Sequence, residues 1–303
     1  MKKILNRIDS SLTMPIDDFL GLKLFGLPQY FSYALFSKIL SLLVIKSKEL
    51  NNFLTGFHRI GFVKGESLPI NTIDELIEIL ERQEAIDDGS HTYRYLVNFE
   101  ARTLISKLIN ENMKKNINDL KKYFCSEIYL TNVQVATNFS IPNSNKEKEF
   151  YSENFHCDHY LSTYFKAQIL LENVDSSQGP LNCFSKKDTL KIMKQLNWKD
   201  RFNRKEIKAT PHMNTGKKGD VLFFSTTECL HKAGIPKDNK TRTLITLVFQ
   251  AIPNLSKDYN PFLLEDLEED LTVWENENDL LSKKFAKPTK ISQLVSYFFS
   301  FIS

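Results

Sequence analysis

The sequence has little net charge and few cysteines, and each shortage excludes a class of protein. Its 303 residues include 40 Lys or Arg and 37 Asp or Glu, which leaves a formal net charge of +3 at pH 7. This balance gives no overall attraction to nucleic acid, so we expect no nucleic-acid partner. The four cysteines are widely spaced without a CxxC pair, and no signal peptide is recognisable. We therefore expect reduced thiols and a cytoplasmic location.

Long apolar runs are also missing. The best candidate, residues 24–46, is interrupted by Pro28 and Lys38, whereas a membrane-spanning helix needs about 20 mainly apolar residues. Pro28 suits a first turn, so we expect a helix over residues 29–46. The C-terminal residues 283–302 combine four lysines with apolar residues at helical spacing. These terminal helices could pack on the domain, or bind a partner or a membrane surface as peripheral elements, and the sequence leaves both interpretations open.

The remaining chain can form a core, because 42% of its residues are hydrophobic and 12% are aromatic. No internal repeat is visible. We divide the chain into a helical N-terminal extension (1–50), one main domain (51–255), and an acidic segment followed by an amphipathic C-terminal helix (256–303). In the main domain we expect a helix over 72–81, capped by Thr72 and Glu75 as a capping box, and a long helical stretch over 99–124.

Strand-like segments follow the helices in the main domain. They are rich in β-branched and aromatic residues and are separated by turn residues, over 127–139, 165–174, 219–226 and 241–252. Helices followed by strands predict a mainly antiparallel β core with helices packed outside (α+β). The closed form that suits such strands is a double-stranded β-helix, a cupin-like jelly roll. Residues 185–215 interrupt the strands with a short helix and a basic loop, which is typical of a lid or binding loop.

The stretch "FHCDHY" (155–160) contains two of only six histidines, placed around an aspartate. In a strand, residues i and i+2 share a face, so His156 and Asp158 should point the same way and Cys157 should point oppositely. An imidazole beside a carboxylate supplies two ligands of a metal site. Since an HxD match alone is weak, the interpretation needs a third ligand elsewhere in the chain.

The segment 217–250 provides that context. A Gly-Asp turn starts an apolar strand, His231 follows the strand, and the next strand begins near Arg242. Two histidines and one carboxylate leave three positions of an octahedron open, which is the facial triad of non-haem Fe(II) oxygenases. The open positions can accept O2 and a bidentate 2-oxo acid. An arginine fork matches the far carboxylate of 2-oxoglutarate, so we expect Arg242 to bind it.

These residues resemble the phytanoyl-CoA dioxygenase-like family of Fe(II)/2-oxoglutarate oxygenases, which includes ectoine hydroxylases. The resemblance covers about residues 55–252 and is strongest in "NFHCDHY", "LLENVDSSQGPL" and "GDVLFF…LHKAG…TRTL". It implies that His156, Asp158 and His231 bind iron and that Arg242 anchors 2-oxoglutarate. It also implies co-substrate contacts, which fall on these positions: Gln134, Asn138, Phe155 and Gln168. After "GPL" the family usually has a Pro-Gly-Ser-His turn, and here the sequence is "NCFSKKD".

The activity that the resemblance implies is the hydroxylation of a C–H bond in a small or lipid-like organic molecule, with succinate and CO2 as co-products. Three alternatives stay open. The same iron could support desaturation, ring closure or epimerisation; the fold could serve as a non-catalytic binding module docked by its terminal helices; or the same ligands could hold zinc in a hydrolase. A zinc hydrolase would leave Arg242 without a purpose. The sequence leaves the substrate, the oxidised position and the oligomeric state open.

Overall fold

The computed structural model describes residues 50–87, 91–124, 127–141, 154–158, 164–197 and 201–252. The expected terminal helices lie outside these residues. Among the described residues, none of the helices has the length and apolar character needed to cross a bilayer. The helices are α3 (Asn52–Arg59), α4 (Ile70–Glu81), α5 (Phe99–Lys107), α6 (Lys114–Phe124) and α7 (Lys186–Gln195), with a π-helical turn at Leu108–Asn112 and a 3-10 turn at Arg204–Glu206.

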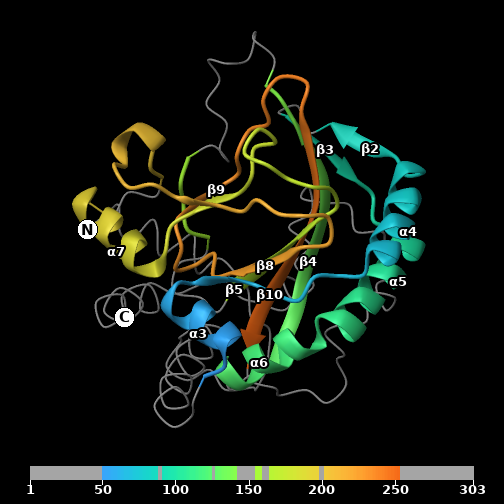
Figure 1. Cartoon of the computed structure of the whole chain (residues 1–303), viewed down its shortest axis with the longest axis horizontal. Coiled ribbons are helices and arrows are strands. Elements are labelled where there is room, and N and C mark those ends of the chain that lie inside the picture. The colour runs from blue at the N-terminus through green and yellow to red at the C-terminus, as the bar shows by residue number, and fades with distance from the viewer. Residues whose placement is uncertain are drawn as a thin grey trace, which may run out of the picture.

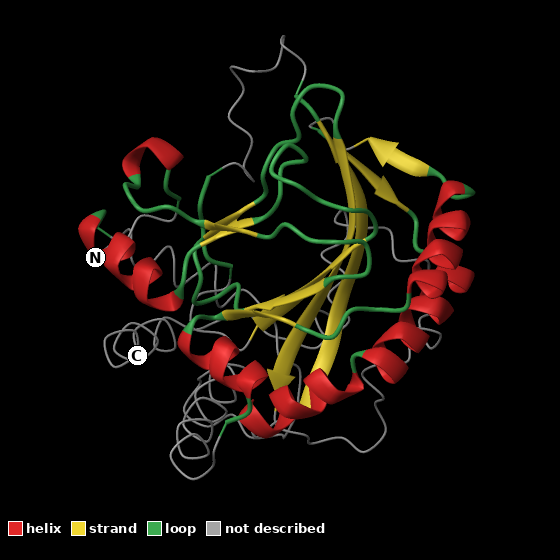
Figure 2. Ribbon diagram, viewed as in Figure 1, coloured by secondary structure: helices red, strands yellow, loops and turns green. Residues whose placement is uncertain are grey.

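The strands form two antiparallel sheets (Figures 1 and 2). The large sheet has the order β1-β8-β5-β10-β4-β3-β2 and the small sheet the order β7-β6-β9. Their bounds are β1 (Phe62–Lys64), β2 (Ala85–Asp87), β3 (Thr92–Tyr95), β4 (Glu127–Phe139), β5 (Tyr164–Leu170), β6 (Asn182–Cys183), β7 (His212–Met213), β8 (Val221–Phe224), β9 (His231–Lys232) and β10 (Thr241–Ile252). This architecture confirms the predicted jelly-roll class with flanking helices.

One face of the large sheet packs against helices α3 to α6, and the small sheet lies across from the other face (Figure 1). The helix-facing side of β10 carries Ile245, Leu247 and Phe249, all fully buried in the main core. Because side chains alternate along a strand, Arg242 and Thr246 face the small sheet instead. The interior between the two sheets is therefore more polar than the core beneath the helices.

The predicted elements were found with three local corrections. The helix expected from residue 72 begins at Ile70, and its N-cap is Pro69, which makes no side-chain capping bond. Thr72 therefore lies inside the first turn, and the predicted capping box of Thr72 and Glu75 was wrong. Strand β5 ends at Leu170 rather than at residue 174. Strand β8 starts at Val221 rather than at residue 219, because Gly219 turns the chain with φ +85°.

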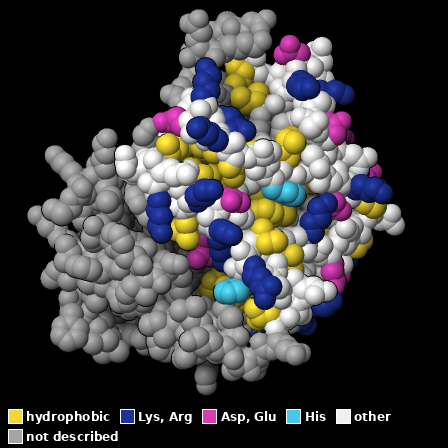
Figure 3. Space-filling view, turned by 60° about the vertical axis from the view of Figure 1, so that its left-hand side comes forward, with side chains coloured by type: hydrophobic (Ala, Val, Ile, Leu, Met, Phe, Trp, Pro, Cys, Tyr) yellow, Lys and Arg dark blue, Asp and Glu magenta, His cyan; other side chains and the backbone are white. Residues whose placement is uncertain are grey.

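The helical stretch expected over 99–124 is present but interrupted by the π-helical turn, and it buries Leu104, Ile105, Leu108 and Ile109. Asn98 is the N-cap of helix α5, and its side chain accepts a hydrogen bond from the backbone N–H of Ala101. Helix α7 lies within the predicted excursion 185–215, on the side of the small sheet. Figure 3 shows this side of the molecule, where basic, acidic and apolar side chains are interspersed.

Candidate metal and co-substrate site

His156 and His231 lie directly opposite each other, because His156 forms an isolated antiparallel β-bridge with His231 of β9, at the edge of the small sheet. Their backbones exchange two hydrogen bonds, from His156 N to His231 O at 3.0 Å and from His231 N to His156 O at 2.9 Å. Residues paired in this way project their side chains from the same face. The ring centroids are accordingly 4.7 Å apart. Backbone pairing therefore joins two histidines that lie far apart in the sequence.

Backbone carbonyls orient both imidazoles. The Nδ1 of His156 lies 2.8 Å from the carbonyl oxygen of Asn154, and the Nδ1 of His231 lies 3.0 Å from that of Cys229. A carbonyl oxygen can only accept a hydrogen bond, so each Nδ1 carries the proton and each Nε2 keeps its lone pair. Both Nε2 atoms are therefore available as metal ligands, and the partner of Nδ1 fixes the orientation of each ring.

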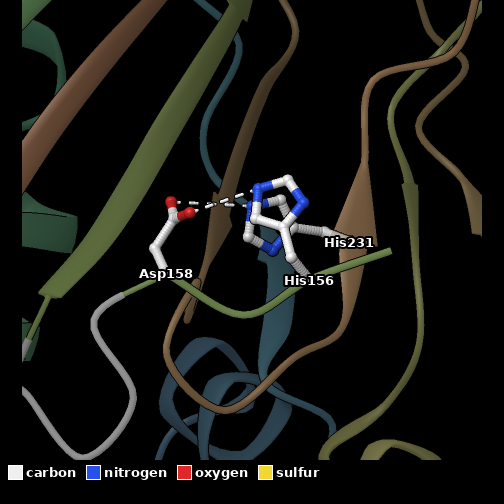
Figure 4. A group of neighbouring side chains, drawn as sticks. All are labelled: His156, Asp158 and His231. Carbon is white, nitrogen blue, oxygen red and sulfur yellow. Dashed lines mark ion pairs between the residues drawn. The ribbon is translucent and has the colours of Figure 1, made fainter. Parts of the chain in front are cut away.

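Asp158 faces both Nε2 atoms (Figure 4). Its Oδ1 lies 3.3 Å from His156 Nε2, and its Oδ2 lies 3.6 Å from His231 Nε2. The backbone N–H of Asp158 donates to the carbonyl of Thr226 at 2.8 Å, which fixes the segment against the loop before β9. Candidate ligand atoms of the three residues lie within 4.8 Å of one another. A divalent ion could contact all three after small side-chain adjustments.

The electrostatics of the group favour the protonation states that a metal requires. Burial would raise the pKa of Asp158, but the charge of Lys166 and the two imidazoles hold that pKa well below its ordinary value. Burial lowers the pKa of His231, although Asp158 counteracts part of this effect. Near neutral pH the carboxylate is therefore ionised and His231 is neutral, as metal ligation demands.

The donor set is two imidazole nitrogens that face one carboxylate. These ligand types suit Fe(II), and three protein ligands leave three of six octahedral positions for other molecules. Zinc accepts the same ligand types, so the three residues alone do not select the metal. The chemistry of the surrounding residues must decide between the two ions.

Arg242 provides the deciding feature. Arg242 is only 2% exposed, and its side chain faces the space between the sheets. Nη2 donates to Asn138 Oδ1 at 2.8 Å, while Nε and Nη1 have no hydrogen-bond partner among the residues that the structure describes. Burial lowers the pKa of Arg242 to about 10, and nearby Glu172 offsets part of the effect, so the group stays charged at neutral pH. A buried cation with unmatched donors is suited to an anionic ligand.

The three predicted amide side chains lie on the same face of the large sheet as Arg242, and one of them, Asn138, is its register partner. Strand register places Gln134 of β4 opposite Thr246 of β10, and Thr246 opposite Gln168 of β5. Asn138 accepts from Arg242 and donates to Thr92 at 2.7 Å, so within the structure it orients the guanidinium. These four predicted positions thus share the interior face of the large sheet.

Phe155 is placed differently from the other predicted positions. It is fully buried in an apolar cluster with Phe184 and Phe202, and successive residues of an extended segment point to opposite sides. Cys157 packs against the same cluster, as expected for a residue pointing away from the ligands. The Phe155 side chain therefore lies on the side away from the three ligands, and its contact with the co-substrate stays a prediction.

Sequence reasoning missed two polar residues of the interior. Lys166 Nζ lies 2.5 Å from Asp158 Oδ2, and Asn214 Nδ2 donates to Gln168 Oε1 at 3.0 Å. A lysine inside an otherwise apolar strand was the available signal for Lys166. Asn214 gave no such signal, because it lies in a loop after the two-residue strand β7. Both contacts join the large sheet to segments on the opposite side of the interior.

Comparison with known proteins gave solved structures only: no family model matches the chain, and no curated protein does. HygX from Streptomyces hygroscopicus with nickel and 2-oxoglutarate bound is 16% identical, covers 70% of this chain and 91% of its own, and has a TM-score of 0.48. The non-heme alpha ketoglutarate dependent epimerase SnoN from nogalamycin biosynthesis is 15% identical, with 80% and 95% covered and a TM-score of 0.49. An oxidoreductase of the 2OG-Fe(II) oxygenase family from Burkholderia pseudomallei is 10% identical, with 69% and 94% covered and a TM-score of 0.45. All three TM-scores are below 0.5.

Proposed function

We propose that this chain is a non-haem Fe(II)/2-oxoglutarate-dependent oxygenase. The observation that carries the proposal is that a candidate metal site and a buried arginine lie between the same two sheets. A His-Asp-His group that can hold a metal shares the interior with a buried arginine whose Nε and Nη1 have no partner in the described part of the chain. A metal site alone fits several enzyme classes, but the unmatched guanidinium calls for a carboxylate-bearing co-substrate.

The residues have separate roles in this proposal. His156, Asp158 and His231 hold iron, and bound iron with 2-oxoglutarate supplies the oxidising chemistry. Arg242 binds the far carboxylate of 2-oxoglutarate, and Asn138 orients its guanidinium through the 2.8 Å hydrogen bond. Gln134 and Gln168 contact the same co-substrate from the adjacent strands. The balanced reaction converts 2-oxoglutarate, O2 and R–H into succinate, CO2 and R–OH.

Several finer assignments belong to the same proposal. The sequence motifs favour the phytanoyl-CoA dioxygenase-like group, with residues 51–255 as the oxygenase domain and the segments 1–50 and 256–303 as extensions. We propose a small organic substrate, with a lipid-like one as the narrower choice, and a cytoplasmic location with peripheral membrane contact through the terminal segments. Hydroxylation is the default outcome, and desaturation, ring closure or epimerisation on the same iron is the second candidate.

The other classes explain fewer of these features. A zinc hydrolase would use the three ligands but would gain nothing from a buried, partly unmatched arginine. A non-catalytic binding module would have no reason to keep both imidazoles in the tautomer that presents Nε2 to a metal. The oxygenase assignment accounts for the ligands, their tautomers and the guanidinium together.

An anaerobic titration tests the proposal. Fe(II) and 2-oxoglutarate added to the metal-free protein should give a weak visible charge-transfer band, because a 2-oxo acid chelates the ferrous ion. The Asp158→Ala variant should lack the band. Arg82→Met is a matched control, because it removes an arginine whose ion pair with Glu100 is exposed, and it should keep the band. Succinate release upon admission of O2, screened over candidate substrates by product mass, would identify the reaction. A wild-type protein that binds Fe(II) without the band would contradict the proposal.

A further inference from the structure

Lys166 is an unusual residue for its strand. Strand β5 is buried at every position except Lys166, which is intermediate, and the lysine side chain is only 22% exposed. Its register partner Val248 places it on the face of the large sheet that carries Thr246 and Gln168. An ammonium group in such a position is costly unless an anion compensates its charge.

Asp158 provides the compensating charge from across the interior. Lys166 Nζ lies 2.5 Å from Asp158 Oδ2, so the ammonium donates a charge-assisted hydrogen bond to this oxygen. Asp158 Oδ1 points instead towards His156 Nε2 at 3.3 Å. Asp158 Oδ2 also faces an imidazole nitrogen, His231 Nε2 at 3.6 Å, so the two carboxylate oxygens differ because Oδ2 additionally accepts the hydrogen bond of the ammonium.

This asymmetry limits how the carboxylate can bind a metal. A carboxylate can ligate through one oxygen or through both, and the two modes occupy different numbers of coordination positions. An ammonium on Oδ2 competes for the lone pairs that a second metal bond would need. Ligation through Oδ1 alone keeps three octahedral positions open, whereas ligation through both oxygens leaves two. Two positions would accommodate a bidentate 2-oxo acid but not O2 as well.

We propose that Lys166 is a positioning residue of the metal centre: it holds Oδ2 of Asp158, so that the carboxylate ligates through one oxygen and a third coordination position stays open. This inference rests on the proposed metal site but needs neither 2-oxoglutarate nor turnover. Lys166 touches a ligand rather than the reacting atoms, and its role is comparable to that of the carbonyl groups that orient the two imidazoles.

The test counts the water molecules on bound Mn(II), used alone as the probe. Water-proton relaxivity per bound Mn(II) scales with the number of coordinated waters, and a calorimetric titration establishes that the ion is fully bound. For Lys166→Met, we expect relaxivity about one third below wild type, because two waters replace three when both oxygens ligate. Lys166→Arg, which retains a charged donor, should restore the wild-type value.

Lys64→Met is the matched control, because it removes another Lys–Asp pair, with Asp220 at 2.9 Å, that involves none of the three ligands. It should leave the relaxivity unchanged. A Lys166→Met variant with wild-type relaxivity would overturn the inference while leaving the proposed function standing. A wild-type protein that binds no Mn(II) would overturn both. Circular dichroism verifies folding, and Lys166→Leu replaces Lys166→Met if the latter does not fold.

Discussion

Two backbone carbonyls determine which nitrogen of each histidine can bind a metal. Because the carbonyls of Asn154 and Cys229 accept from Nδ1, His156 and His231 both present Nε2 to Asp158. Each carbonyl belongs to the residue two positions before its histidine, so the local backbone sets the tautomer. Arg242 differs from the two histidines, because two of its guanidinium nitrogens, Nε and Nη1, have no hydrogen-bond partner among the described residues.

Replacing Arg242 should weaken co-substrate binding without removing the metal. For Arg242→Met, we expect the Kd of 2-oxoglutarate, measured anaerobically with Mn(II) bound, to rise about 10- to 100-fold. Hydrogen bonds to charged groups contribute about 1.5–3 kcal/mol, and tenfold corresponds to about 1.4 kcal/mol. The Kd of Mn(II) alone should not change. An unaltered Kd for 2-oxoglutarate would show that another residue binds it.

The metal-free protein should lose stability as the pH falls through the range of histidine titration. Burial lowers the pKa of His231 below its ordinary value of 6.5, so the unfolded chain takes up a proton that the folded chain resists. Stability falls with decreasing pH wherever the unfolded state binds more protons. Urea unfolding at pH 7.5 and 5.5 should therefore show a smaller loss for His231→Gln than for wild type. Equal losses would contradict the assigned direction of the pKa shift.

At the scale of elements, the sequence predicted long strands well and short ones poorly. Strands β4 and β10 have the predicted bounds, because 12 or 13 residues of β-branched and aromatic character leave little ambiguity. The small sheet has strands of only two residues, which carry no periodicity, yet it positions His231 and Cys183. The HxD pair was predictable because it is local. The contact of Lys166 with Asp158 depends on how two separate segments face each other, and no sequence pattern encodes that.

Two glycines let the chain cross itself beside the small sheet. Gly179, in the "GPL" turn, has φ +64°, and a Cβ there would lie 2.3 Å from the carbonyl carbon of Ile235. A Cβ on Gly234 would lie 2.4 Å from the carbonyl oxygen of Pro180. Both clashes are with backbone atoms, which cannot move aside as a side chain can. The crossing therefore ties the turn before β6 to the segment between β9 and β10.

Gly179→Ala should lower the free energy of unfolding by at least about 2 kcal/mol, since overpacking costs about 1–3 kcal/mol and the left-handed conformation adds about 1–2 kcal/mol. Gly56→Ala in α3 is the control, because its Cβ would meet a Val63 methyl at 3.0 Å and alanine favours the helix. It should have little effect on the urea midpoint. Equal midpoints for the two variants would contradict the proposed crossing.

At the scale of the whole molecule, the two faces of the large sheet have different functions. The face towards α3–α6 carries the main hydrophobic core, including Phe165, Ile245 and Phe249. The opposite face carries the predicted polar residues and looks towards the small sheet, where Asn214 contacts Gln168 and Phe224 packs against His231 at 5.5 Å. The apolar core can therefore stabilise the fold while the interior between the sheets keeps the polar groups that a ligand needs.

Ligands of that interior should stabilise the whole fold. A ligand that binds only the native state contributes about 2.7 kcal/mol at a free concentration of 100 times its Kd. Mn(II) should raise the Tm of the wild-type protein in a thermal scan, and 2-oxoglutarate should raise it further only when Mn(II) is present. The Arg242→Met variant should keep the first increase and lose most of the second. A 2-oxoglutarate effect of equal size without metal would place its binding site elsewhere.

The central claim is that one metal ion and one 2-oxo acid bind together between the two sheets. Anomalous diffraction from crystals grown anaerobically with Mn(II) and 2-oxoglutarate tests it most directly. We predict a single strong anomalous peak bonded to His156 Nε2, His231 Nε2 and one oxygen of Asp158, with the far carboxylate of 2-oxoglutarate paired to Arg242. A peak remote from these three residues, or a 2-oxoglutarate molecule that does not reach Arg242, would contradict the claim.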